Sequence, residues 1–97
     1  MIGDTYYNKH SRSASHLAVG GVVKGIDNVL SGKWRNAFAV VRPPGHHSGG
    51  HNSIRGFCVY NNVAIGAMHA RNKHKVQRIA IFDWDIHHGD GTQNVFR

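Results

Sequence analysis

The first clear pattern along the chain is a helical one over residues 11–30. Small and apolar residues recur there at three- and four-residue spacing: Ala14, Leu17, Ala18, Gly21, Val22, Ile26, Val29 and Leu30. This spacing predicts a helix with one buried stripe. Ser11 or Ser13 is placed to cap its start, and Ser31-Gly32 predicts its end, because glycine adopts the left-handed conformation at low cost. The ten residues before the helix show no clear period and predict irregular chain.

Two short apolar runs predict buried strands. Residues 37–41 (AFAVV) end at Pro43-Pro44, which cannot donate backbone hydrogen bonds, and residues 78–82 (RIAIF) form the second run. The glycine-rich residues 42–56 between them predict a loop.

A second helix is predicted between the loop and the second run. Its apolar side runs from Val63 to about Lys73, and Asn61-Asn62 can cap its start. Strand, loop, helix and strand make a βαβ unit with parallel strands and a right-handed crossover. The predicted fold class is therefore α/β.

Composition narrows the class of protein. The 97 residues are 40% hydrophobic and 18% charged, which is typical of one small globular domain rather than of a disordered chain. The net charge is +7, but the basic residues are dispersed, and no fold of a sequence-specific nucleic-acid-binding module is recognisable. The single cysteine, Cys58, fits a reducing compartment, and no apolar stretch approaches membrane-spanning length. We expect a soluble, intracellular chain.

Candidate chemistry gathers after the two predicted strands. Three of the five acidic residues, Asp83, Asp85 and Asp90, surround a histidine pair after the second run, and His46-His47 follow the first. Because ligands collect beyond the carboxyl ends of parallel strands, we expect the two clusters at one edge of the sheet.

The residue types suggest a metal and an acid–base pair. Asp85 and His87, two residues apart, point to the same side of an extended segment and suit zinc or another first-row metal. A catalytic zinc needs three protein ligands, and only two are obvious here. His46 and His47 could act as general base and acid, with Asp83 and Asp90 available to set their tautomers.

A purely structural role remains open for each of these residues. The Asp-x-His pair could be a surface turn, and His46-His47 an ordinary polar loop. Phe57 and Trp84 would by default be core aromatics and Cys58 a small buried hydrophobe. The histidines without neighbouring carboxylates are expected at the surface: His10, His16, His51, His69 and His74.

Three blocks resemble those of the zinc-dependent histone deacetylases, in the same order. They are residues 42–47 (RPPGHH), 56–65 (GFCVYNNVAI) and 83–93 (DWDIHHGDGTQ), and the upstream DTYYNKHS is also similar, so nearly the whole chain is covered. Trp84 and the Gly-Thr-Gln after Asp90 resemble class II, whereas Asp90 itself resembles class I. Ser48 and Arg55 stand where alanine and, in class II, methionine are usual.

The resemblance implies a fold and a domain. The fold would be the three-layer α/β/α arginase/deacetylase type with a mainly parallel sheet. Residues 1–97 would then be the N-terminal part of a catalytic domain whose C-terminal part is absent.

The resemblance also implies site roles, by position. Asp85 and His87 match two zinc ligands. His46 matches the histidine bonded to the attacking water and His47 the one that protonates the leaving amine, with Asp83 and Asp90 as their partners. Gly56 and Phe57 match the acetyl-lysine tunnel. Oxygens of Asp83, Asp85 and His87 match a structural potassium site, and Phe96 a second one.

The implied function is zinc-dependent hydrolysis of N6-acetyl-lysine in histones or other proteins. We expect acetylated histone tails as partners, a corepressor-type complex that represses transcription, and residence in the nucleus or cytoplasm. Two alternatives stay open: an acetylpolyamine-type small-molecule deacetylase, and a non-catalytic fragment that keeps only a partner-binding surface. The family's third zinc ligand and its oxyanion-stabilising tyrosine or histidine come from later segments. The 97 residues alone are therefore expected to be inactive and poorly stable.

Overall fold

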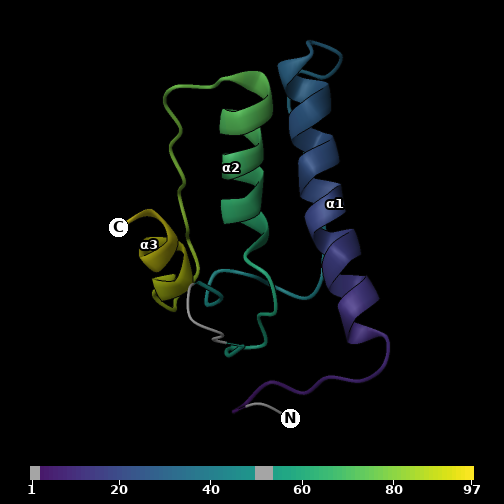
Figure 1. Ribbon diagram of the computed structural model, residues 1–97, viewed down its shortest axis with the longest axis vertical. Coiled ribbons are helices and arrows are strands. Elements are labelled where there is room, and N and C mark those ends of the chain that lie inside the picture. Colours follow the sequence, from purple (N-terminus) through teal and green to yellow (C-terminus); the bar gives the residue numbers. More distant parts are fainter. Residues whose placement is uncertain (1–2, 50–53) are drawn as a thin grey trace.

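The computed structural model describes residues 3–49 and 54–97. Its regular elements are the helices α1 (Ser11–Leu30), α2 (Asn62–His74) and α3 (Asp90–Phe96). The helices α1 and α2 stand side by side and run in the same direction (Figure 1). Helix α3, next to the C-terminal residue, lies beside α2 (Figure 1). The two long connections return from the upper ends of α1 and α2 to the lower end of the molecule, where the loops meet (Figure 1).

Helix α1 has the bounds that its periodicity predicts, but its start is built differently. The N-cap residue is His10, and its side chain makes no capping hydrogen bond. Instead, Asn8 Oδ1 accepts from the His10 backbone N–H at 2.8 Å, and Ser11 Oγ accepts from the Asn8 N–H at 2.9 Å. The prediction that Ser11 or Ser13 caps the helix is therefore wrong, because Asn8 folds the preceding turn. Gly32, with φ of 76°, ends the helix as predicted.

Helix α2 extends one residue beyond each predicted end. Asn61 is its N-cap, and Asn61 Oδ1 accepts from the Ala64 N–H at 3.1 Å, so the predicted cap is confirmed. The helix ends where Lys75 takes the left-handed conformation, with φ of 60°.

Small residues bring α1 and α2 close together. A Cβ atom on Gly66 would lie 2.8 Å from both Val22 Cγ1 and Ile26 Cδ1, so only glycine fits there without movement. The buried apolar core consists of small side chains: Ala18, Cys58, Ala64, Ala67 and Ala70. Leu17, predicted in the buried stripe, is 75% exposed, because the buried side of α1 is centred on Ser15, Ala18 and Gly25.

The two runs predicted as strands are extended chain without strand pairing. Within residues 3–49 and 54–97 only isolated bridge residues occur, such as the Arg55–Cys58 pair, so the parallel sheet stays a prediction. Side chains nevertheless alternate as in a strand. Ala37 and Ala39 of the first run, and Ile79 of the second, line a groove against α1 and α2.

The other side of each run is open to solvent. Phe38 and Phe82 on this side are 85% and 86% exposed, and no residue of either run is buried, so the prediction that both runs are buried strands is wrong. The physical reason is that no second layer of the described residues covers it.

The exposure of single residues agrees with some of the sequence predictions and not with others. Cys58 is fully buried, as expected, and His10 and His16 lie at the surface. Phe57 and Trp84 are exposed rather than in the core. His51 lies outside the described residues. No helix in the described part of the chain is both long enough and apolar enough to cross a membrane.

Candidate active site

Two histidine–aspartate pairs lie side by side at the lower end of the molecule. His46 Nδ1 is 2.8 Å from Asp83 Oδ2, and His47 Nδ1 is 2.6 Å from Asp90 Oδ1. The two imidazole centroids are 4.1 Å apart. The histidines follow the first extended run and the aspartates the second, so the structure brings together the two clusters that the sequence places after separate apolar runs.

Backbone contacts hold the histidine loop against α2 and α3. Asn62 Nδ2 donates to the Pro43 carbonyl at 3.0 Å, and the Thr92 N–H donates to the His46 carbonyl at 3.2 Å. Gly45 is buried where an added Cβ would lie 2.6 Å from the Asn62 backbone nitrogen. The loop can therefore approach the start of α2 only because residue 45 has no side chain.

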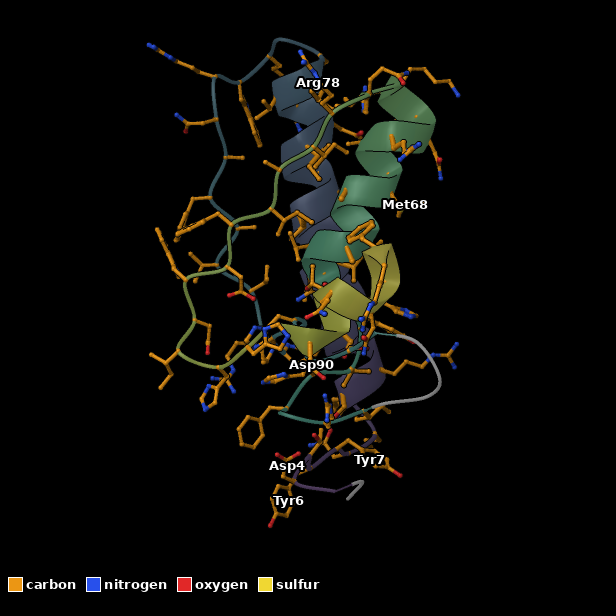
Figure 2. The ribbon with its side chains drawn as sticks, turned by 90° about the vertical axis from the view of Figure 1, so that its left-hand side faces the viewer. Asp4, Tyr6, Tyr7, Met68, Arg78 and Asp90 are labelled. Atoms are coloured by element: carbon orange, nitrogen blue, oxygen red, sulfur yellow. The ribbon has the colours of Figure 1, made fainter. Side chains whose placement is uncertain are left out.

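Asp90 contacts two side chains, one through each carboxylate oxygen. It is the first residue of α3, which the sequence pattern did not predict, and Figure 2 shows it at the lower end of that helix. Its Oδ1 contacts His47, and its Oδ2 forms an ion pair with the Arg55 guanidinium. Arg55 is thus a site residue that sequence reasoning singled out only as a departure from the family pattern.

Burial and charge act on His47 in the same direction. Burial is the largest cause lowering the pKa of His47 below its ordinary value, followed by electrostatic effects of the neighbouring His46 and Arg55 side chains. The neutral imidazole is therefore favoured. His47 and Asp90 are both largely buried, which strengthens their contact relative to a surface pair.

Asp85 and His87 lie next to these pairs and are more exposed. His87 Nδ1 is 2.9 Å from Asp85 Oδ1, and the His87 backbone N–H donates to the same oxygen at 2.7 Å. These two contacts lower the pKa of Asp85, so its carboxylate is ionised. The His87 ring centroid is 6.1 Å from that of His47. An ionised oxygen and a ring nitrogen therefore face one another beside the histidine pair.

The Gly56-Phe57 turn borders the site and is held by the N-terminal segment. Gly56 and Phe57 both have positive φ, 55° and 63°. Asp4 Oδ1 accepts from the Gly56 N–H at 2.9 Å, and Thr5 Oγ1 accepts from the Phe57 N–H at 3.1 Å. The segment predicted to be irregular thus has a defined task. The similarity of DTYYNKHS to the family marked this segment, but it did not indicate that Asp4 and Thr5 hold the turn.

Outside this site, two surface predictions are wrong. His69 and His74 each contact Asp27 through Nε2 and are only 24% and 20% exposed. Asp27 lies more than forty residues away in sequence but on the facing side of α1, so local sequence could not reveal this carboxylate.

The chain matches known proteins over nearly its full length. The family model for the histone deacetylase domain matches residues 2–97. Polyamine deacetylase HDAC10 of Rattus norvegicus is 48% identical over 91 residues, covering 94% of this chain and 15% of that protein. Histone deacetylase clr3 of Schizosaccharomyces pombe is 48% identical over 93 residues, covering 94% of this chain and 13% of that protein.

A solved structure has a similar fold. The crystal structure of the HDA15 HD domain superposes with a TM-score of 0.90 at 43% identity, covering 96% of this chain and 26% of that chain. The described residues therefore have the fold of the corresponding part of that domain. Since the family model matches residues 2–97, a span that includes both histidine–aspartate pairs, the chain belongs to the histone deacetylase family.

Proposed function

We propose that this chain supplies the first part of the active site of a zinc-dependent deacetylase. The observation that supports this most strongly is the pair of adjacent dyads, His46–Asp83 and His47–Asp90, beside Asp85 and His87. Hydrolysis of an acetamide requires a proton to leave the attacking water and a proton to reach the departing nitrogen. Two adjacent imidazoles are suited to these two transfers.

The contacts in the two dyads indicate which nitrogen of each ring is available for proton transfer. An ionised carboxylate only accepts hydrogen bonds, so Nδ1 of His46 and of His47 carries the proton that each dyad shares. The Nε2 atom of each neutral ring then carries no proton and can accept one. We assign His46 Nε2 as the base that takes a proton from the attacking water. His47 Nε2 takes up a proton from solvent and donates it to the leaving amine, and His46 then returns the proton of the water to solvent. Water adds to the carbonyl carbon, the C–N bond breaks, and acetate and the amine are released.

Asp85 and His87 fit two positions of a zinc site. Their facing oxygen and ring nitrogen, 2.9 Å apart, are ligand types that zinc prefers. Within residues 3–49 and 54–97 no third carboxylate, imidazole or thiol completes this pair. When bound, zinc would polarise the acetamide carbonyl and lower the pKa of water toward about 7. The potassium sites remain predictions from the resemblance.

The proposed substrate is N6-acetyl-lysine in histones or other proteins, with a corepressor-type complex as partner. Phe57, exposed on a turn beside His47, would contact the lysine stem, and the Gly56 carbonyl would lie at its end. A second candidate is an acetylated polyamine, favoured by 48% identity to a protein named polyamine deacetylase. Both substrates present the same acetamide, so these dyads do not distinguish them.

Two substitutions in the intact protein test the division between zinc ligand and base. His87→Ala should abolish both deacetylation and zinc retention. His46→Ala should lower kcat by about 100- to 10,000-fold, as for loss of a general base, and keep the metal. His10→Ala, at the exposed start of α1, is the matched control and should keep both.

Zinc content by elemental analysis, measured alongside activity, decides the outcome. Loss of zinc from the His46 variant, or full activity of either site variant, would refute the assigned roles. An intact protein that binds no zinc and removes no acetyl group would favour the non-catalytic alternative.

A separate comparison tests the substrate. The intact protein would be assayed on an acetyl-lysine peptide and on an acetylated polyamine, and kcat/KM compared. We expect the larger value with the peptide. A larger value with the polyamine would instead support the second candidate.

A further inference from the structure

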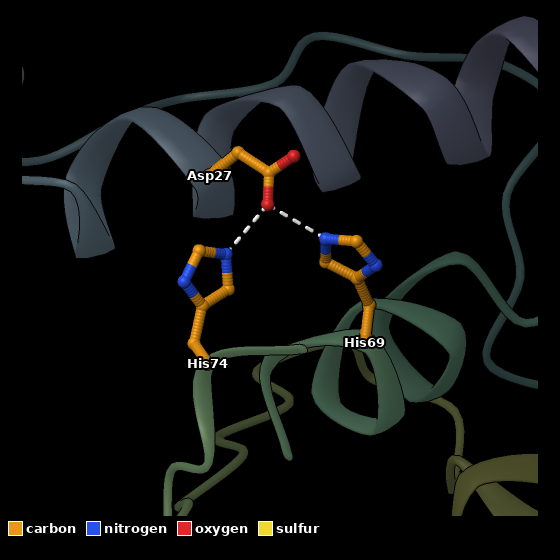
Figure 3. Close-up of side chains that lie close together, drawn as sticks. All are labelled: Asp27, His69 and His74. Atoms are coloured by element: carbon orange, nitrogen blue, oxygen red, sulfur yellow. Dashed lines mark hydrogen bonds and ion pairs between the residues drawn. The ribbon is translucent and has the colours of Figure 1, made fainter. Parts of the chain in front are cut away.

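A second cluster of potential metal ligands lies between α1 and α2. Asp27 Oδ1 is 2.7 Å from His69 Nε2 and 2.6 Å from His74 Nε2, and the two rings approach that oxygen from opposite sides (Figure 3). One ligand atom from each of the three residues lies within 4.8 Å of the others. Three groups that are distant in sequence thus converge on one point.

This cluster is separate from the candidate active site. The histidine–aspartate dyads lie next to the start of α2, whereas His74 is the last residue of that helix. Thirteen residues at a rise of about 1.5 Å place the two ends roughly 20 Å apart. The cluster is therefore a different site from the one to which Asp85 and His87 belong.

We propose that Asp27, His69 and His74 form a binding site for a divalent transition-metal ion of the zinc class. Two imidazole nitrogens with one carboxylate oxygen are a ligand set for zinc and similar first-row metals, not for magnesium or calcium, which take oxygen ligands. A bound ion would connect the last turn of α1 to the end of α2. It would brace the two helices where their contact is otherwise made by small side chains.

The alternative is a metal-free hydrogen-bonded cluster, and the two differ in protonation. Without metal, each Nε2–H donates to the Asp27 carboxylate, and Lys73 Nζ, 2.8 Å from Asp27 Oδ2, adds a third donor. With metal, both Nε2 atoms are unprotonated and face the ion with Oδ1. Lys73 is 56% exposed and contacts only the other oxygen, so it leaves Oδ1 available. Its positive charge should stabilise the metal-free cluster but weaken binding of a cation.

The test uses the intact protein carrying His87→Ala, so that the zinc site of the proposed function is disabled. After treatment with a chelator and its removal, the protein is titrated with Zn²⁺ by calorimetry. We expect a binding event of one equivalent that is absent when Asp27→Asn or His74→Gln is added. A hundredfold excess of Mg²⁺ or Ca²⁺ should not displace the zinc.

Two further variants sharpen the result. His10→Gln replaces a histidine outside the cluster and should leave the zinc equivalent unchanged. Lys73→Met should tighten zinc binding severalfold by removing the adjacent charge. Helical circular dichroism of each variant shows that its fold is retained, and His74→Gln decides the test if Asp27→Asn unfolds.

Thermal unfolding gives a second measure of zinc binding to the cluster. Because an ion that binds only the folded state raises Tm, Zn²⁺ should raise Tm of the His87→Ala protein more than that of the His87→Ala/His74→Gln protein. Equal zinc stoichiometry and equal Tm shifts in these two proteins would overturn the proposal. Weaker zinc binding by the Lys73→Met variant would also contradict it.

Discussion

At the scale of single residues, Asp90 links two side chains of the candidate active site. One oxygen contacts His47 and the other pairs with Arg55. A carboxylate shared in this way orients the imidazole while the guanidinium adds a positive charge nearby. Arg55, which stands where class II members usually carry methionine, therefore acts on His47 without touching its ring.

Arg55→Met should raise the pKa of His47. The substitution removes one of the positive charges that lower this pKa, but burial, the largest cause, remains, so the value should move only part of the way back. At a given pH slightly below neutral, more His47 should then be protonated. An NMR titration of the His47 ring protons in metal-free intact protein measures this directly.

Arg12→Met, which removes an exposed charge at the start of α1, is the matched control and should leave the titration unchanged. An unchanged or lower pKa in the Arg55 variant would show that Arg55 has no electrostatic effect on this histidine.

At the scale of elements, the start of α2 connects the core to the site. Asn61 caps α2 through Oδ1, and its Nδ2 donates to Thr92 Oγ1 of α3 at 3.0 Å. Thr92 in turn donates its N–H to the His46 carbonyl. One buried amide thus joins the beginning of α2, the helix that carries Asp90, and the histidine loop.

Asn61→Ala should lower the free energy of unfolding by about 2 kcal/mol, roughly 1 for the cap and 1 for the bond to Thr92. Asn61→Asp keeps the capping oxygen but loses the donor, so its loss should be about half as large. Urea unfolding of the intact protein measures both. If neither variant differs from the original protein, the amide does not contribute to stability as proposed.

The contact between α1 and α2 should depend on pH through Asp27. His74, then Lys73 and His69, hold the pKa of Asp27 far below its ordinary value. A carboxyl group whose pKa is depressed by folding contributes stability above its unfolded pKa, about 3.9, and loses it as the pH falls further. In the presence of a chelator, the protein should therefore lose stability below about pH 4 more steeply than Asp27→Asn does. Parallel Tm curves from pH 6 to pH 2.5 would contradict this.

The elements differ in how far the sequence predicts them. Both long helices follow from repeated apolar positions and end signals, and Asn61 and Gly32 act as those signals indicate. Helix α3 was missed because its seven residues, DGTQNVF, include only two apolar side chains, too few to establish a period. The dyads were expected from the motifs and the crossover. The partners Asp4, Arg55 and Asp27 depend on packing between distant segments and could not be read locally.

At the scale of the whole molecule, one face is built from open apolar side chains. Phe38, Phe82 and Trp84 are 85%, 86% and 83% exposed and come from the two extended connections. Side chains of this size are normally covered in a stable globular protein, so this face limits the stability of residues 1–97 as an independent unit.

Residues 1–97 expressed alone should bind a hydrophobic dye and unfold with little cooperativity. The exposed aromatic residues provide the dye with apolar surface, and among the described residues the buried apolar core consists of small side chains. Phe38→Ser with Phe82→Ser should reduce dye fluorescence, whereas Leu17→Ser, which removes an exposed leucine on α1, should change it less. A sharp thermal transition without dye binding would refute this expectation.

The separation of the dyad partners along the chain has a consequence for how the protein is made. His46 and Asp83 are 37 residues apart, and His47 and Asp90 are 43 apart, with all of α2 in between. Closing such long loops costs entropy that is recovered only when the intervening helix has packed. During synthesis on the ribosome, His46 and His47 emerge before Asp83 and Asp90, so they cannot form these contacts until the later residues have been added. The histidine–aspartate pairs therefore form only after residues 83–90 have been synthesised, and their formation shows when this part of the chain has folded.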